Sequence, residues 1–140
     1  MTIPSDLTQQ YMAHACACSL FAQRLIAADA LLAEDCAQSL HLPYRRQDME
    51  DFLARQNLQD EVTLKKALRL LRQRVMLRTI VRDLNHFADL HEVMRAMTDL
   101  AEVAVQCALS VLHPMLVSRY GEPLGESGQP QKMIVVGMAN

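Results

Sequence analysis

The stretch from Val62 to Phe87, VTLKKALRLLRQRVMLRTIVRDLNHF, decides the fold of this 140-residue chain. It contains no glycine or proline and is rich in Leu, Arg and Lys, which are good helix formers. Its apolar side chains form two stripes when they are projected at about 100° per residue. One stripe is Leu64, Leu68, Leu71 and Val75, and the other is Leu70, Leu77, Val81 and Leu84. A helix with two apolar stripes packs on two sides, so we expect this one to lie between layers.

The same helix carries seven basic residues from Lys65 to Arg82 and no acidic residue among them. Six of them form two groups on roughly opposite faces, namely Lys65, Arg69 and Arg72, and Arg74, Arg78 and Arg82. The chain as a whole is slightly acidic, with a net charge of −2. We therefore expect solvated charges together with structural ion pairs to Asp and Glu of neighbouring helices. Contact of these arginines with phosphate groups is the alternative.

A second long helix is predicted to follow, from Leu90 to just before Gly121. Asp89 and Glu92 have the spacing of a capping box at its start. Apolar residues then recur every three or four positions, which is typical of an amphipathic helix. Pro114 lies inside this pattern and is expected to kink the helix, because proline lacks the N–H donor. The connection between the two long helices is short, so they should pack antiparallel.

Short helical patterns occupy the first third of the chain. Ser5 is expected to cap the first helix. A second apolar run covers residues 20–28, and Asp29 is expected to cap a third helix that extends to Leu40. Residues 47–56 are predicted to form one more short helix. Together with the two long helices, these patterns predict a helical region over residues 1–120.

The sequence changes in character after residue 120. Residues 121–131, GEPLGESGQPQ, hold three of the four glycines and are predicted to form a loop. Residues 132–140 begin with an apolar, β-branched run that predicts a fully buried strand. Such a strand needs sheet neighbours, and no other segment is predicted to be a strand. We therefore expect it to be the first strand of a truncated domain. The alternative is a tail that docks as a strand on the chain itself or on a partner.

The predicted fold class is therefore mainly α: a helical bundle with two long antiparallel helices and a single C-terminal β-strand. A hydrophobic content of 51% and a charged content of 21% argue against intrinsic disorder. The acidic balance gives no electrostatic reason to expect nucleic acid or an anionic membrane as a partner. No apolar run is expected to approach the roughly 20 residues of a membrane span. The N-terminal residues lack a basic region and do not resemble a secretory signal, so we expect a cytoplasmic protein with reduced cysteines.

Few residues suggest a chemical site. His14, Cys16 and Cys18 lie close together, but a closed zinc site needs four ligands, so we expect ordinary helix residues and no metal site. His86 and His91 flank the turn between the long helices and lack the H-E-x-x-H pattern of zinc proteases. Cys107 is expected in the core. No nucleotide-binding glycine motif and no pair of catalytic carboxylates is present, so no catalytic residue is predicted.

Four segments resemble the glutamine synthetase adenylyltransferases, which are also called glutamate–ammonia-ligase adenylyltransferases. LRLLRQRVMLRTIVRDL (68–84) is similar to the family's arginine-rich helix, and FADLHEVMRAMTDLAE (87–102) is similar to its A-D-L-x-E segment. SRYGEPL (118–124) resembles its R-Y-G-x-P turn. QKMIVVGMA (131–139) resembles the strand that leads into its G-M-[GA]-K-L-G-G-x-E-L-N loop. The resemblance is strong over residues 64–139 and weaker over residues 1–63.

The resemblance implies an amino-terminal part of a bifunctional enzyme that adenylylates and deadenylylates glutamine synthetase in nitrogen regulation. The complete enzyme would use ATP and Mg²⁺ held by an Asp-x-Asp pair, under the control of a PII-type signal protein. Residues 132–140 would then begin a truncated nucleotidyltransferase domain, the adenylyl-removing one. Only Gly137 falls on the family's nucleotide-loop region, and the Asp-x-Asp pair would lie beyond Asn140. We therefore expect this chain to be inactive alone. The alternative is a stand-alone helical protein-interaction module without catalytic activity.

Overall fold

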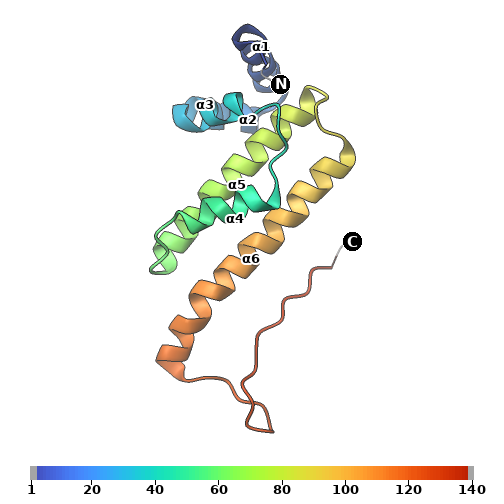
Figure 1. The fold of residues 1–140 in the computed structure, drawn as a ribbon. Coiled ribbons are helices and arrows are strands. Elements are labelled where there is room, and N and C mark those ends of the chain that lie inside the picture. Colours follow the sequence, from blue (N-terminus) through green and yellow to red (C-terminus); the bar gives the residue numbers. More distant parts are fainter. Residues whose placement is uncertain (1–2, 139–140) are drawn as a thin grey trace.

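The computed structural model describes residues 3–138, and within them the fold is built from six α-helices (Figure 1). In chain order these are α1 (Ser5–Cys18), α2 (Leu20–Ala28), α3 (Ala30–Gln38), α4 (Arg46–Ala54), α5 (Glu61–Leu84) and α6 (Leu90–Tyr120). Each helix lies close to the range that its apolar pattern predicts. The mainly α fold class is therefore confirmed.

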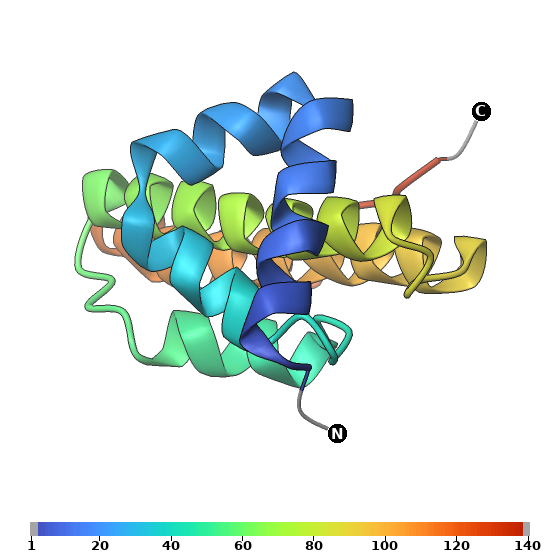
Figure 2. The same ribbon diagram turned by 90° about the horizontal axis from the view of Figure 1, so that it is seen from above.

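Helix α5 is the centre of the molecule. It packs against every other helix, with α6 and α4 along part of its surface and α1, α2 and α3 along another part. Seen from above, α5 lies between the short amino-terminal helices and α6 (Figure 2). α5 and α6 run antiparallel, side by side, as the short connection between them predicts (Figure 1). The two-sided packing that was expected for this helix is confirmed.

Members of the two apolar stripes of α5 enter two separate hydrophobic clusters, whereas Leu70 is half-buried and lies in neither. Leu71 and Val75 are fully buried against α4 and α6, in a cluster completed by Tyr44, Met49, Leu53, Ala67, Ala96 and Val103. Leu77 and Val81 are fully buried against α1, α2 and α3, in a cluster completed by Ala15, Ala22, Leu32, Cys36 and Leu40. Each cluster removes apolar surface from water, which is the main driving force for folding. α5 therefore joins two small cores into one structure.

Side-chain caps fix the starts of several helices. Asp29 accepts a hydrogen bond from the Leu32 N–H at 3.0 Å, as predicted for the start of α3. The first helix differs by one residue, because Pro4 is its N-cap and Ser5 is already helical. The capping box expected at α6 forms only in part. Asp89 accepts from the Glu92 N–H at 2.8 Å, but the Glu92 carboxylate binds Arg82 on α5.

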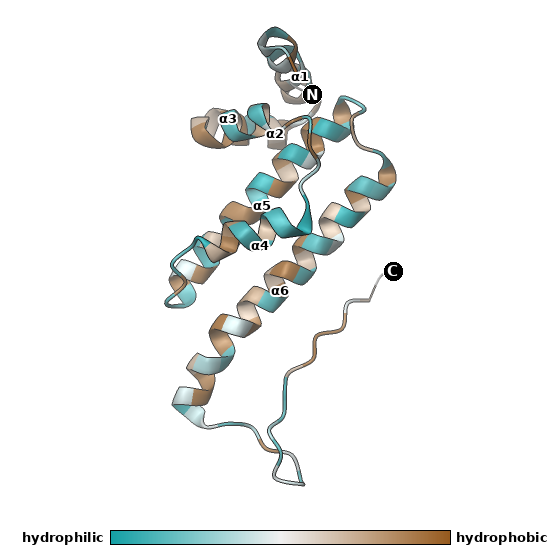
Figure 3. Cartoon of the chain, in the orientation of Figure 1, coloured by the Kyte–Doolittle hydropathy of each residue, from teal (hydrophilic) through white to brown (hydrophobic). Residues whose placement is uncertain are grey.

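Helix α6 is longer than its partners, so its far half lies outside the bundle (Figure 1). Met115, Leu116 and Tyr120 are exposed there, and apolar residues colour much of this half in Figure 3. The most apolar 18-residue window of α6 has a mean hydropathy of 1.6, and only 6% of it is buried. By length and composition α6 could cross a membrane. This corrects the expectation that no apolar run approaches such a length.

Helix α6 is continuous through Pro114 and ends at Gly121, whose φ of 85° lies in the left-handed region. Glycine adopts this conformation without the steric penalty of a side chain. The chain then turns through the expected loop, in which Leu124 and Pro130 form one isolated antiparallel bridge. The sequence therefore identified both the end of the helix and the loop that follows it.

The predicted C-terminal strand is not formed in the described part of the tail. Lys132 to Met138 run back past α6 as an extended segment, and Met133, Ile134, Val135, Val136 and Met138 are between 50% and 89% exposed (Figure 1). A strand needs a neighbour that accepts and donates its backbone hydrogen bonds. Residues 3–138 offer the tail no such neighbour. The rest of the predicted strand, 139–140, lies outside the described residues.

Candidate functional site: the arginines of α5

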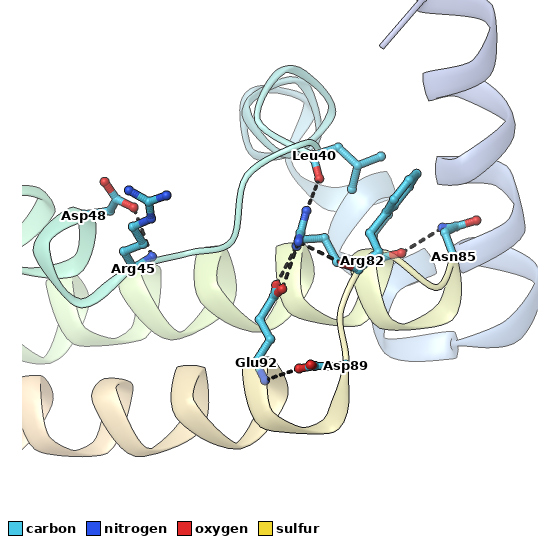
Figure 4. Close-up of polar contacts among 9 residues, drawn as sticks. Leu40, Arg45, Asp48, Arg82, Asn85, Asp89 and Glu92 are labelled. Atoms are coloured by element: carbon cyan, nitrogen blue, oxygen red, sulfur yellow. Dashed lines mark hydrogen bonds and ion pairs between the residues drawn. The ribbon is translucent and has the colours of Figure 1, made fainter. Parts of the chain in front are cut away.

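The most buried charge in the described chain is the guanidinium of Arg82, near the end of α5. Its Nε and Nη2 donate to the two carboxylate oxygens of Glu92 at 2.6 and 2.9 Å (Figure 4). Nη1 donates to the Leu40 carbonyl at 2.7 Å, and Nη2 also reaches the Phe87 carbonyl at 3.1 Å. The paired contact with a carboxylate is the geometry in which arginine binds most strongly. Arg82 thus ties the α5–α6 turn to the end of α3.

Further contacts hold the α5–α6 turn against α1. The Asn85 amide donates to the Tyr11 carbonyl on α1 at 3.0 Å and to the Val81 carbonyl at 2.8 Å. The Tyr11 ring meets Phe87 edge-on, with 4.9 Å between ring centres. These contacts all join one part of the chain to another. The residues around the α5–α6 turn therefore have a structural role.

Arg78 lies one helical turn before Arg82 on α5, and Arg74 lies two turns before it. These two arginines share one acidic partner. The Asp35 carboxylate on α3 lies 2.8 Å from Arg74 Nη2 and 3.4 Å from Arg78 Nη2. The Arg78 guanidinium stacks over the Tyr44 ring at 4.3 Å, and Arg74 Nε donates to the Tyr44 hydroxyl at 3.4 Å. Burial opposes the charge of Arg74, but Tyr44 and Asp35 outweigh it and raise its pKa. Both guanidiniums are therefore held in place by other parts of the chain, and the raised pKa of Arg74 keeps that group charged.

The two groups of basic residues predicted on opposite faces of α5 have different surroundings. Arg74, Arg78 and Arg82 point into the structure and pair with acids of other helices, as expected for structural ion pairs. Lys65, Arg69 and Arg72 are exposed, as expected for solvated charges. The sequence identified the arginine face but not its partners. Asp35 lies 43 residues from Arg78 and Glu92 lies 10 residues from Arg82, and neither spacing predicts a pair as the three- or four-residue spacing within a helix does.

The other candidates from the sequence do not assemble into a site. His14 and Cys18 share an exposed face of α1, with the Cys18 sulfur 3.8 Å from His14 Nε2. His86 and His91 are exposed beside the α5–α6 turn. Among residues 3–138, no group of three His, Cys, Asp or Glu side chains converges as a metal site would require. The described residues therefore supply no ligand set for Mg²⁺, which the resemblance implies for the complete enzyme and not for this chain.

Gly137 lies in the exposed tail, and a Cβ at this position would meet no atom within 4 Å. No described element packs around it in the way that a nucleotide-binding loop would need. Its assignment to nucleotide binding stays a prediction.

Two of the cysteines, Cys36 and Cys107, lack a reactive setting. Burial raises the pKa of the Cys36 thiol to about 12. Burial likewise raises the pKa of Cys107, which packs against the cluster that contains Leu71 and Val75. A thiol with a raised pKa is a poor nucleophile near neutral pH, because the thiolate is the reactive form. Both residues therefore act as part of the apolar packing, which agrees with the core position expected for Cys107.

Comparisons with known proteins identify the family of this chain. The sequence profile of the family described as glutamate-ammonia ligase adenylyltransferase matches residues 9–140. A bifunctional glutamine synthetase adenylyltransferase/adenylyl-removing enzyme of Aromatoleum aromaticum is 41% identical over 138 residues, which cover 99% of this chain and 15% of that protein. The enzyme of the same name from Chromobacterium violaceum is 41% identical over 94% of this chain and 15% of its own length.

The chain thus spans about 15% of the length of these curated relatives. A third relative of the same name, from Ralstonia nicotianae, is 48% identical over 79 residues. No solved structure matches the chain. The profile match alone covers nearly the whole sequence, and the resemblance of the arginine-rich helix and of the turn after α6 agrees with it. The chain therefore belongs to the glutamate-ammonia ligase adenylyltransferase family.

Proposed function

We propose that this chain forms the amino-terminal helical region of an enzyme that attaches AMP to glutamine synthetase and removes it again. The observation that carries the proposal is the match of residues 9–140 to the family, together with relatives named for both activities. In this role the chain does no chemistry of its own. It supplies a rigid helical base, centred on α5, on which the rest of the enzyme is arranged.

The exposed half of α6 supports a role within a longer protein. Apolar side chains that are exposed together usually mark a contact surface. Met115 and Leu116 in α6 and the apolar tail are all exposed on this chain. The relatives are several times longer, so most of each relative has no counterpart here to cover these residues.

The remaining expectations follow from the same proposal. The complete enzyme would bind ATP and Mg²⁺ and would take glutamine synthetase as its protein substrate. A PII-type signal protein would control which activity dominates, and the enzyme would work in the cytoplasm. Each of these properties belongs to the longer protein, and none requires a residue of this chain to touch a reacting atom.

A chimaeric enzyme tests the proposal. The 138 matched residues of the Aromatoleum aromaticum relative would be replaced by the corresponding residues of this chain. We expect the chimaera to release AMP from adenylylated glutamine synthetase with phosphate, and to transfer AMP from ATP. The chain alone should do neither. Arg69→Met is the matched control within the graft, because Arg69 is exposed and should not matter.

Two results would contradict the proposal. AMP release or transfer by the isolated chain would show that it carries chemistry of its own. A chimaera that folds, with normal helical circular dichroism, but lacks both activities would show that this chain does not serve as the helical base of the enzyme.

A further inference from the structure

A hollow of about 290 Å³ opens between α3, α4 and the middle of α5. Four arginines border it, from three parts of the chain: Arg45 and Arg55 at the two ends of α4, and Arg74 and Arg78 on α5. We propose that this hollow binds the phosphate group of a small ligand. The proposal does not rest on the function proposed above, because it uses only the geometry and charge of this surface.

The charge balance favours an anion. The acidic residues that border the hollow are Asp35 and Asp48, against the four arginines. This leaves a local excess of two positive charges on a chain whose overall charge is −2. Among the described residues, neither Arg45 nor Arg55 has a carboxylate within ion-pair distance of its side chain. A doubly charged phosphate would balance the excess.

Hydrogen-bond donors remain available as well as charge. In the described structure, Arg74 contacts the Tyr44 hydroxyl through Nε and Asp35 through Nη2. Arg78 contacts Asp35 through Nη2. Arg78 Nε is buried without any acceptor, so Asp35 does not saturate this guanidinium. Because Arg78 Nε itself is buried, a bound anion would accept from the Nη groups of Arg74 and Arg78. Arginine is the side chain best suited to phosphate, because its planar fork donates to two oxygens together.

Aromatic rings hold the two inner arginines in place. Arg78 stacks over Tyr44 at 4.3 Å, and Arg74 lies over Phe52 with 5.1 Å to the ring centre. A guanidinium fixed in this way loses little freedom when it binds a ligand, and this increases affinity. Arg45 and Arg55 are exposed and can close over a bound group from the rim. The arrangement thus combines a fixed inner pair with an adaptable outer pair.

The test is an NMR titration of the intact, ¹⁵N-labelled chain at constant ionic strength. The probes are inorganic phosphate, AMP and acetate. Phosphate and AMP should each give saturable shifts of the arginine Nε–H signals, whereas acetate should bind more weakly. Equal affinities would mean that the free phosphate group is enough for binding, and tighter binding of AMP would point to a nucleotide monophosphate; either result supports the proposal.

Matched variants locate the site. Arg55→Gln should weaken phosphate binding about tenfold, the usual effect of losing one charged hydrogen bond. Arg69→Gln, on the opposite exposed face of α5, should leave it unchanged. Arg45→Gln serves as a second variant if Arg55→Gln alters the circular dichroism spectrum. The proposal is overturned if no probe gives a saturable shift, or if Arg69→Gln weakens binding as much as Arg55→Gln. It is also overturned if acetate binds as tightly as phosphate, because the hollow would then accept a carboxylate of another protein segment.

Discussion

Replacing Arg82 by methionine should remove a buried polar link that joins α5 to α6 and to the end of α3. The substitution deletes four hydrogen bonds, to both Glu92 carboxylate oxygens and to the carbonyls of Leu40 and Phe87. It leaves Glu92, which is only 24% exposed, as a partly buried charge without a partner. Breaking a buried ion pair in this way costs about 3–5 kcal/mol. The whole domain is expected to have a free energy of unfolding of about 5–15 kcal/mol.

Urea denaturation followed by far-ultraviolet circular dichroism measures this loss, because the chain has no tryptophan for fluorescence. With a urea dependence of about 1–3 kcal/mol per molar, Arg82→Met should lower the midpoint by at least about 1 M. Arg69→Met is the control and should stay within about 0.5 kcal/mol of the wild type, because Arg69 is exposed. The double variant Arg82→Met, Glu92→Met removes the unpaired carboxylate and should recover at least about 1 kcal/mol.

Two outcomes would refute this reasoning. If Arg82→Met unfolds at the same urea concentration as Arg69→Met, the corner between α5 and α6 does not stabilise the fold. If the double variant is no more stable than Arg82→Met, the loss does not come from the stranded Glu92 carboxylate.

Three further predictions concern the core, the tail and the cysteines. Leu71→Ala and Leu77→Ala should each cost about 2–5 kcal/mol in urea denaturation, because each is fully buried in a different cluster; a wild-type midpoint for either would show that its cluster contributes little. Deleting residues 130–140 should raise solubility and leave the helical circular dichroism almost unchanged; a large loss of helicity would show that the tail supports the bundle. At about pH 8, iodoacetamide should modify the exposed Cys18 in the folded chain and Cys36 only after unfolding, as mass spectrometry would show; modification of both at equal rates would contradict the burial of Cys36.

Local patterns along the chain predicted most of the fold. The two apolar stripes of α5 predicted a helix that is buried on two sides, and Asp29 predicted the start of α3. These features could be read in advance because helix periodicity and capping depend on residues within a few positions of one another. The expected strand after Lys132 is not confirmed in the described tail, because a strand depends on a neighbour that these residues do not provide.

What the sequence by itself determined was the class of structure and the family. Six helices, their approximate limits and the arginine face of α5 all follow from short-range spacing, and the four segments that resemble the family lie in order along the chain. Only the tertiary structure decided what the arginines do. It placed Glu92 against Arg82 and a single Asp35 between Arg74 and Arg78, and it brought both ends of α4 to the same hollow. The physical reason is that a charge acts on whatever lies within a few ångströms, and folding brings together residues that are distant in sequence.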